Sequence, residues 1–222
     1  MRLSHSLILV LSRKFGLRSD NFMRLLIAWR MLIPPTFKQV TVMRFFFARG
    51  RMCFNEENYE QATTWFRSAL GLNDIPEMRL WLGKTYRLSG NFESGKEILD
   101  PIMDSELNNG EVWLEWARIC FSLEKIEDAH DGYTQAVLIG VPDNLLGSVY
   151  SEWAELSEIR EDNETLIKTL TKLIEDREIE DPELADLYLK RAAAYGQLGD
   201  LDAAKLDHQY AETIPIDEDE EA

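Results

Sequence analysis

The residues that most often do chemistry in proteins are few and scattered in this sequence. Its histidines are His5, His130 and His208, and its cysteines are Cys53 and Cys120. These residues do not have the spacing of metal ligands, and the chain has no glycine-rich loop that could hold a phosphate. Two cysteines also do not make a disulfide framework. We therefore expect a protein that is not an enzyme and that takes no metal or other cofactor.

The cysteines belong instead to a spacing that recurs along the chain. Cys53 follows a small residue, Gly50, by three positions and precedes another, Ala62, by nine. The equivalent anchor residues of the later copies are Tyr86, Cys120, Ala154 and Tyr195. Successive anchors are 33, 34, 34 and 41 residues apart. A period of about 34 residues, with helical spacing inside each copy, is typical of a helical-repeat solenoid.

Small residues at fixed positions explain how such copies would pack. Two antiparallel helices approach closely only where the facing side chains are small. The small residues at these positions are Gly50, Ala62, Gly83, Gly95, Ala117, Ala129, Ala192 and Ala204. We expect Ala129 and Ala204 to be buried at close helix contacts. One helix pair cannot bury both of its faces, so each pair should stack on the next.

These residues resemble the tetratricopeptide repeat (TPR) family, whose pattern has Trp, Leu-Gly and Tyr in the first helix and Ala, an aromatic residue and Pro later. The stretches that carry the resemblance are ENYEQATTWFRSAL (57–70), LWLGKTYRLSGNFESG (80–95), EVWLEWARICFSLEKIEDAHDGYTQAV (111–137) and AAAYGQLGDLDAA (192–204). The resemblance implies an all-α, TPR-like solenoid of four to five helix pairs over residues 43–216. Gly199 and Asp200 then form the turn within the last pair, since glycine tolerates the backbone of a helix end.

The fourth copy departs from this pattern. Ala154 fits, but Asn163 stands where the other copies have a small residue, and no glycine marks the turn. The long step to the next copy predicts an insertion in the acidic stretch 175–183. In the last copy His208 occupies an aromatic position of the repeat, so we expect it to pack or snorkel at a helix interface. We expect His130 on a helix exterior.

Charge divides the chain into a basic head and an acidic remainder. The formal net charge is −16, yet residues 1–51 hold ten Lys or Arg and a single Asp. We expect residues 1–42 to form a basic amphipathic helical head and residues 217–222 to form an acidic tail that is too polar to pack. No stretch is apolar for the roughly 18 residues that a membrane-spanning helix needs.

The apolar side chains of the head require a cover. Three covers stay open: the first repeat, an anionic membrane surface, or an organelle import machinery if the head is a transit peptide. The expected location is accordingly the cytoplasm with peripheral membrane contact, or an organelle.

By resemblance, the first helices of the repeats line a concave groove in which TPR proteins bind their partners. The residues at groove positions are Arg44, Phe47, Arg51, Phe54, Leu80, Trp81, Lys84, Arg87, Leu114, Glu115, Arg118 and Phe121, with Asp186, Leu189 and Lys190 in the last copy. Phe47 and Trp81 are large apolar side chains, so we expect them to anchor a partner. The Lys and Asn pattern with which some TPR proteins hold a C-terminal carboxylate is not evident.

The function expected from the sequence is a non-enzymatic scaffold or adaptor that binds a protein or peptide in this groove. The alternative is a membrane-associated assembly factor anchored through the basic head. Nucleic acid is not an expected partner, because the repeat array is strongly acidic and only the head could contact phosphate.

Overall fold

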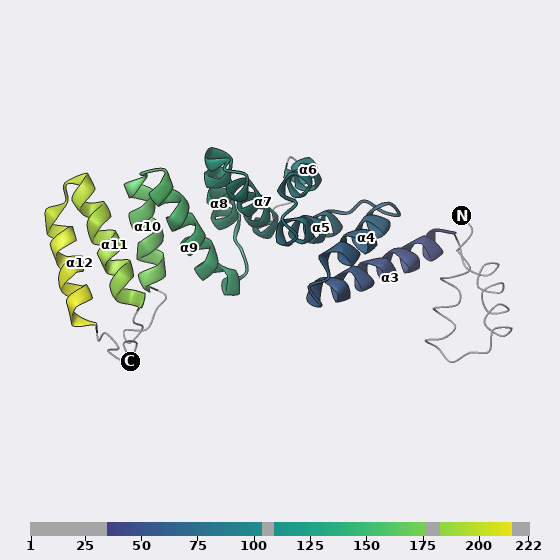
Figure 1. The fold of residues 1–222 in the computed structure, drawn as a ribbon, viewed down its shortest axis with the longest axis horizontal. Coiled ribbons are helices and arrows are strands. Elements are labelled where there is room, and N and C mark those ends of the chain that lie inside the picture. The colour runs from purple at the N-terminus through teal and green to yellow at the C-terminus, as the bar shows by residue number, and fades with distance from the viewer. Residues whose placement is uncertain (1–34, 104–108, 176–182, 215–222) are drawn as a thin grey trace.

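The computed structural model describes residues 35–103, 109–175 and 183–214, and the regular structure within these ranges is helical (Figure 1). The helices are α3 (Pro35–Asn55), α4 (Tyr59–Leu70), α5 (Pro76–Leu88), α6 (Phe92–Met103), α7 (Gly110–Ser122), α8 (Ile126–Ile139), α9 (Asp143–Ile159), α10 (Asn163–Glu175), α11 (Glu183–Leu198) and α12 (Leu201–Thr213). They follow one another along the molecule in the order of the chain (Figure 1). The predicted all-α fold is confirmed.

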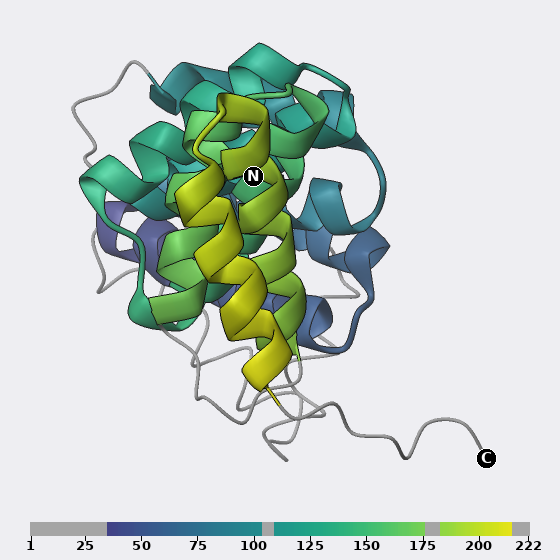
Figure 2. The ribbon, with the colours of Figure 1, turned by 90° about the vertical axis from the view of Figure 1, so that its left-hand side faces the viewer.

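The helices form antiparallel pairs, from α3–α4 to α11–α12, that stack as a solenoid. In each pair, the helix that comes first in the chain is called the first helix below. Every helix packs against its neighbours in the chain, and the first helices α5 and α7 also touch each other. Seen along the stack, the pairs lie one behind another (Figure 2). The core is therefore a row of clusters, around Phe66, Leu99 and Tyr133 in turn, as expected for stacked repeats.

Small residues bring the paired helices together as the sequence predicts. A Cβ atom placed on Gly50 would lie 2.6 Å from the ring of Phe66, which leaves room for glycine alone unless the ring moves. Ala129 and Ala204 are both buried, as predicted. Close helix contact at small residues thus recurs from the first pair to the last.

The two cysteines lie in the same helix contacts. Cys53 and Cys120 are buried, and neither forms a disulfide bond. Burial raises the pKa of the Cys120 thiol to about 12, so this side chain stays protonated and unreactive at neutral pH. The position that both cysteines share in the repeat is therefore a packing position in the core.

One turn closes every pair. The backbone N–H five residues after an anchor donates a hydrogen bond to the carbonyl of that anchor, at 2.8 to 3.0 Å. These bonds join Asn58 to Cys53, Asn91 to Tyr86, Lys125 to Cys120, Asp162 to Ser157 and Asp200 to Tyr195. The residue before each donor has a left-handed backbone, with positive φ at Glu57, Gly90, Glu124, Glu161 and Gly199. This is the Schellman ending of a helix, and it confirms the predicted turn at Gly199 and Asp200.

The turn shows that the predicted register of the fourth copy is wrong. Its anchor is Ser157 rather than Ala154, because Asp162 donates to the carbonyl of Ser157. Ala154 instead takes the small-residue position three places earlier. The second helix then has buried Leu166, Leu170 and Leu173 at the positions that Ala129, Tyr133 and Ala136 take in the third copy. Asn163 therefore does not stand at the small-residue position of this copy. Leu166 does, so the fourth copy still departs from the pattern there.

The wrong register of the fourth copy follows from assuming that every copy has a period of about 34 residues. The first helix of the fourth copy, α9, has 17 residues, whereas α5 and α7 have 13 each. The steps between anchors are consequently 37 residues from Cys120 to Ser157 and 38 residues from Ser157 to Tyr195. Of the predicted insertion at 175–183, residues 176–182 lie outside the described residues.

The expectation for His208 is also wrong, because its side chain is exposed. The equivalent residues Phe66, Leu99 and Tyr133 are fully buried by the pair that follows them. Within the described residues no helix packs beyond α12, so the same position in the last pair faces solvent. The buried polar residue of α12 is Asp207, whose carboxylate receives hydrogen bonds of 2.7 and 2.8 Å from Arg191.

The ends of the chain lie largely outside the described residues. Residues 1–34 of the predicted head, and the predicted tail at 217–222, are among the residues that the structure does not describe. Residues 35–42, assigned to the head from the sequence, are the start of α3. In the ranges from 35 to 214 that are described, no helix has both the length and the apolar character that a membrane crossing requires.

Two glycines of the last turn should respond oppositely to the same substitution. Gly196 lies inside α11 with open space around it, so Gly196→Ala should raise the free energy of unfolding by about 0.5–1 kcal/mol. Gly199 has φ +82°, where a Cβ is strained, so Gly199→Ala should lower it by about 1–2 kcal/mol. Urea denaturation followed by circular dichroism measures both. Equal shifts for the two variants would contradict the assigned turn.

Candidate protein-binding surface

Contacts between successive first helices define one continuous surface. The guanidinium of Arg51 on α3 lies 4.9 Å from the ring centroid of Trp81 on α5. The ion pairs that continue this connection are Lys84–Glu111 (2.5 Å), Arg87–Glu115 (2.8 Å), Arg118–Glu152 (2.7 Å) and Lys190–Glu158 (3.3 Å). Each joins one first helix to the next. We call this surface the first-helix face. It consists of the residues of α3, α5, α7, α9 and α11 that lie one position after, or two, five, six or nine positions before, the anchor of their helix.

Aromatic side chains occupy the α3–α5 end of the first-helix face. The ring of Trp81 meets that of Phe54 edge-on with centroids 5.2 Å apart, and that of Phe47 at 6.4 Å. Two cations contact the indole, since the ammonium of Lys84 lies 5.2 Å from its centroid and the guanidinium of Arg51 lies over the same ring. Trp81, Phe47 and Phe54 are all half-buried. Part of each predicted aromatic residue is therefore open to a partner, and part is packed in the repeat.

Two of the predicted groove residues belong to the interior. Leu80 is 4% exposed and Leu114 is 0% exposed, each within a hydrophobic cluster. In α5 and α7 the position six before the anchor points between helices, whereas the equivalent Ser151 on α9 and Leu189 on α11 are exposed. In α3, whose described neighbours lie on one side only, the equivalent Phe47 is half-buried. Leu80 and Leu114 are thus core residues rather than open groove residues, and that part of the expectation is corrected.

The middle of the first-helix face is a chain of paired charges. Glu115 is buried, and its two carboxylate oxygens accept hydrogen bonds from Arg87 (2.8 Å) and Arg118 (2.9 Å). Arg118 also donates two bonds, of 2.7 and 2.8 Å, to Glu152. Burial by itself would lower the pKa of Arg118, but the bonds and charges of Glu152 and Glu115 raise it above its usual value. Arg87 and Arg118 are therefore already compensated within the protein.

Charges at the two ends of the face have no such partners. Arg44 and Arg51 on α3 are exposed, and neither makes an ion pair with any described residue. The same holds at the other end for Glu155 on α9 and Asp186 on α11, which are also exposed. Of the remaining predicted residues, Phe121 packs partly on the core of the third copy, and Leu189 and Lys190 are exposed.

The fourth copy contributes acids to the first-helix face that are absent from the predicted groove residues. With Ser157 as anchor, Glu152, Glu155 and Glu158 take the positions of Glu115, Arg118 and Phe121 in the third copy. A signal for this register exists in the sequence. A glutamate stands two positions before the first residue of the second helix in Glu57-Asn58 and Glu124-Lys125, and Glu161-Asp162 repeats it.

Similarity to solved structures decides the fold family. Neither a protein-family model nor a curated protein sequence matches the chain. The crystal structure of MamA protein superposes with a TM-score of 0.62 at 18% identity, covering 77% of this chain and 90% of that one. The TPR protein YrrB, described as having an unusual peptide-binding site, gives 0.59 at 14% identity, with 75% and 82% covered. TTC0263, a thermophilic TPR protein of Thermus thermophilus, gives 0.51 at 15% identity, with 76% and 89% covered.

The chain has the tetratricopeptide repeat fold. At identities of 14–18% the likeness establishes the architecture, and it covers about three quarters of the sequence. The TPR-like solenoid expected from the repeat spacing is therefore confirmed.

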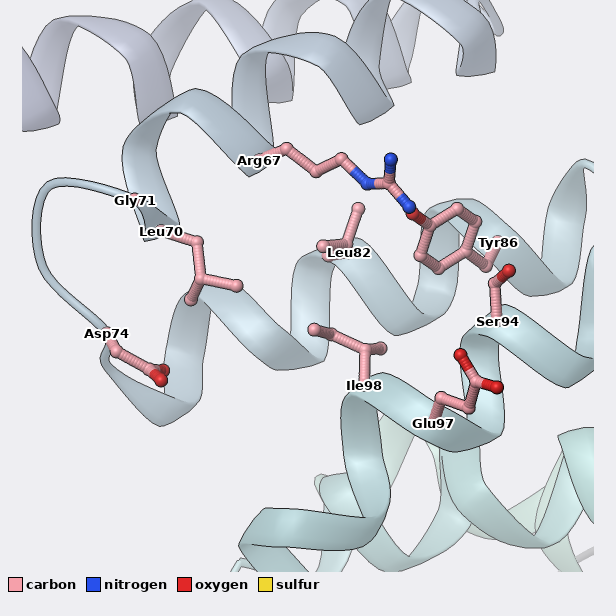
Figure 3. Close-up of a pocket in the computed structure, with 9 residues that line it drawn as sticks. All are labelled: Arg67, Leu70, Gly71, Asp74, Leu82, Tyr86, Ser94, Glu97 and Ile98. Carbon is pink, nitrogen blue, oxygen red and sulfur yellow. The ribbon is translucent and has the colours of Figure 1, made fainter.

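A separate hollow of about 490 Å³ opens between the first two TPR units (Figure 3). Its walls come from α4, α5, α6 and the loop before α5, and it shares no residue with the first-helix face. The guanidinium of Arg67 lies 5.6 Å from the ring centroid of Tyr86, whose buried hydroxyl has no hydrogen-bond partner among the described residues. At the rim, the hydrogen bond from Arg79 lowers the pKa of Asp74. The hollow is open, and it combines an apolar floor with charges of both signs.

The sequence suggested that His130 lies on a helix exterior, but its side chain is not fully open to solvent. It is half-buried against the ring of Trp153, and its Nδ1 receives hydrogen bonds from the indole N–H (3.3 Å) and from Arg160 (2.7 Å). Burial and then the charge of Arg160 lower the pKa of His130. Because two donors converge on Nδ1, the neutral ring accepts there, and the residue is part of the packing between the third and fourth TPR units.

The paired charges predict unequal costs for two glutamates. Removing buried Glu115 leaves Arg87 and Arg118 without their shared acceptor, so Glu115→Ala should lower the free energy of unfolding by about 1.5–3 kcal/mol. Glu111 makes one partly exposed pair with Lys84, and Glu111→Ala should cost less than about 1 kcal/mol. Urea denaturation of the two variants gives the comparison. A Glu111 variant as unstable as the Glu115 variant would contradict this assignment.

Proposed function

We propose that the protein is a non-enzymatic scaffold that binds a partner protein through an extended peptide segment laid on the first-helix face. The observation that carries the proposal is the α3–α5 end of this face, where the ring of half-buried Trp81 is contacted by Arg51 and Lys84. Aromatic and arginine side chains dominate binding energy in protein interfaces. The peptide-binding site named for the structurally similar YrrB supports the same use of the fold.

Selection from a random peptide library tests this function while the natural partner is unidentified. The full chain is immobilised and offered random peptides of about 15 residues displayed on phage, long enough to span roughly 50 Å when extended. Peptides that bind should lose at least about tenfold in affinity to Trp81→Leu, and less to Arg51→Ala, because the indole supplies most of the apolar contact. Fluorescence anisotropy with the synthetic peptides measures both.

The matched control is Lys205→Ala, an exposed cation on the second helix α12. Its affinity should equal that of the unaltered protein, and thermal unfolding must show that Trp81→Leu is folded at the assay temperature. Failure to select any peptide, or equal binding by the Trp81 variant and the control, would contradict the proposal.

A second candidate function is peripheral attachment of this scaffold to an anionic membrane. The observation that favours it is the composition of residues 1–51, which hold ten Lys or Arg and a single Asp beside many apolar residues. Each basic residue near an anionic surface contributes about 1 kcal/mol. This attachment would place the scaffold at the cytoplasmic surface of a membrane.

Vesicle sedimentation tests the membrane attachment. The full chain should sediment with vesicles of phosphatidylcholine and phosphatidylserine, and not with phosphatidylcholine alone. Replacing Arg13, Lys14 and Arg18 by Glu should abolish sedimentation, whereas Lys205→Glu should leave it unchanged. The attachment is wrong if the chain ignores both kinds of vesicle or if the triple variant sediments like the unaltered chain.

A further inference from the structure

The charge of the first-helix face changes sign along the stack. On α3 and α5 the face presents Arg44, Arg51, Lys84 and Arg87, with Glu77 as an acid at this end. On α9 and α11 it presents Glu152, Glu155, Glu158 and Asp186, with Lys190 as a base. The acids of α9 belong to this surface because Glu152 pairs with Arg118 on α7 and Glu158 pairs with Lys190 on α11.

Ion pairs within the protein neutralise the charges in the middle of the first-helix face. Lys84, Arg87 and Arg118 are each bonded to a glutamate of the next first helix, and Glu158 pairs with Lys190. A partner charge placed there would compete with bonds that already exist. The middle of the face therefore offers a ligand little net charge.

The two ends keep their charge. Arg44 and Arg51 lie seven residues apart, which places them on the same side of α3 two turns from each other. At the other end, Glu155 and Asp186 lie on α9 and α11. None of these side chains makes an ion pair with a described residue, and all are exposed. Figure 1 shows that α5 and α7 lie between α3, which carries the two arginines, and the helices α9 and α11, which carry the two acids. One ligand therefore reaches both charged groups only if it is extended.

From this we infer that the ligand of the first-helix face is an extended segment of a partner protein with segregated charge. Its acidic residues, flanked by an apolar anchor for the Trp81 patch, lie at the α3–α5 end, and its basic residues lie at the α9–α11 end. The inference rests on the proposed function and adds the chemistry and the placement of the partner. Opposed charges at the two ends would fix the direction of the segment and exclude one placed the wrong way round.

The acidic tail of the chain itself, residues 217–222, complements only the Arg44 and Arg51 end. It has neither a basic cluster nor an aromatic residue. A segment with both charges satisfies both ends, and for this reason we assign the surface to a partner rather than to the tail of another copy.

The library selection separates this inference from the proposed function. It is run in parallel on the unaltered chain, on Arg44→Glu with Arg51→Glu, on Glu155→Lys with Asp186→Lys, and on the control Lys205→Glu. The unaltered chain and the control should select peptides with an acidic cluster at one end and a basic cluster at the other. The arginine double variant should select peptides that lack the acidic cluster, and the acid double variant should select peptides that lack the basic one.

Affinities of the selected peptides complete the test. A peptide selected on the unaltered chain should bind either double variant about 5- to 30-fold more weakly, and this difference should shrink at high salt. Peptides without segregated charge, or peptides indifferent to both double variants, would overturn the inference while the proposed function stands. A synthetic DEDEEA peptide that binds as tightly as the selected ones would assign the surface to the tail. Failure to select any peptide would overturn the proposed function itself.

Discussion

The turn that closes each helix pair is the constraint on which the rest of this structure depends. A hydrogen bond from the fifth residue after the anchor, together with one left-handed residue, sets where the first helix ends and where the second begins. That register decides which residues meet between the helices, and therefore where small side chains are required. It decides equally which side chains of the first helix remain on its free side. Glu57, Glu124 and Glu161 adopt the left-handed backbone at a cost of about 1–2 kcal/mol each, so the turn is kept even where glycine is absent.

The sequence predicts such a turn only where residue preferences express it. At Gly199 and Asp200 both residues favour the observed backbone, and the turn was located from the sequence alone. At Glu161 nothing in the residue type favours a positive φ, and a constant period of 34 placed the anchor three residues too early. An error of three residues keeps a helical residue near its original face, which is why Ala154 still resembled a repeat position. It moved Glu158 off the predicted surface, although the fold itself was unaffected.

Burial inside the candidate surface was harder to predict than the repeat itself. The spacing identifies residues on the free side of a first helix, but it does not show how closely the preceding pair approaches. Leu80 and Leu114 are core residues, although Ser151 and Leu189 at the same position are exposed. Glu115 is buried, whereas its two arginines stay partly exposed. The charges of Arg87 and Arg118 look like ligand-binding charges in the sequence. They are bonds between repeats, and this lateral pairing is visible only when successive first helices are placed side by side.

The end of the stack follows the same rules with one neighbour removed. In a solenoid each copy is stabilised by its own contacts and by its neighbours, so a position that faces the next copy is apolar only while a next copy covers it. Phe66, Leu99 and Tyr133 occupy that position in the first three pairs and are fully buried. His208 occupies it in the last described pair and is exposed, and a polar ring there costs little in water. The buried polar residue of α12 lies one position earlier. Asp207 is buried, and both of its carboxylate oxygens accept hydrogen bonds from Arg191. An ion pair within the terminal pair thus replaces part of the apolar contact that the interior pairs obtain from the pair stacked on them.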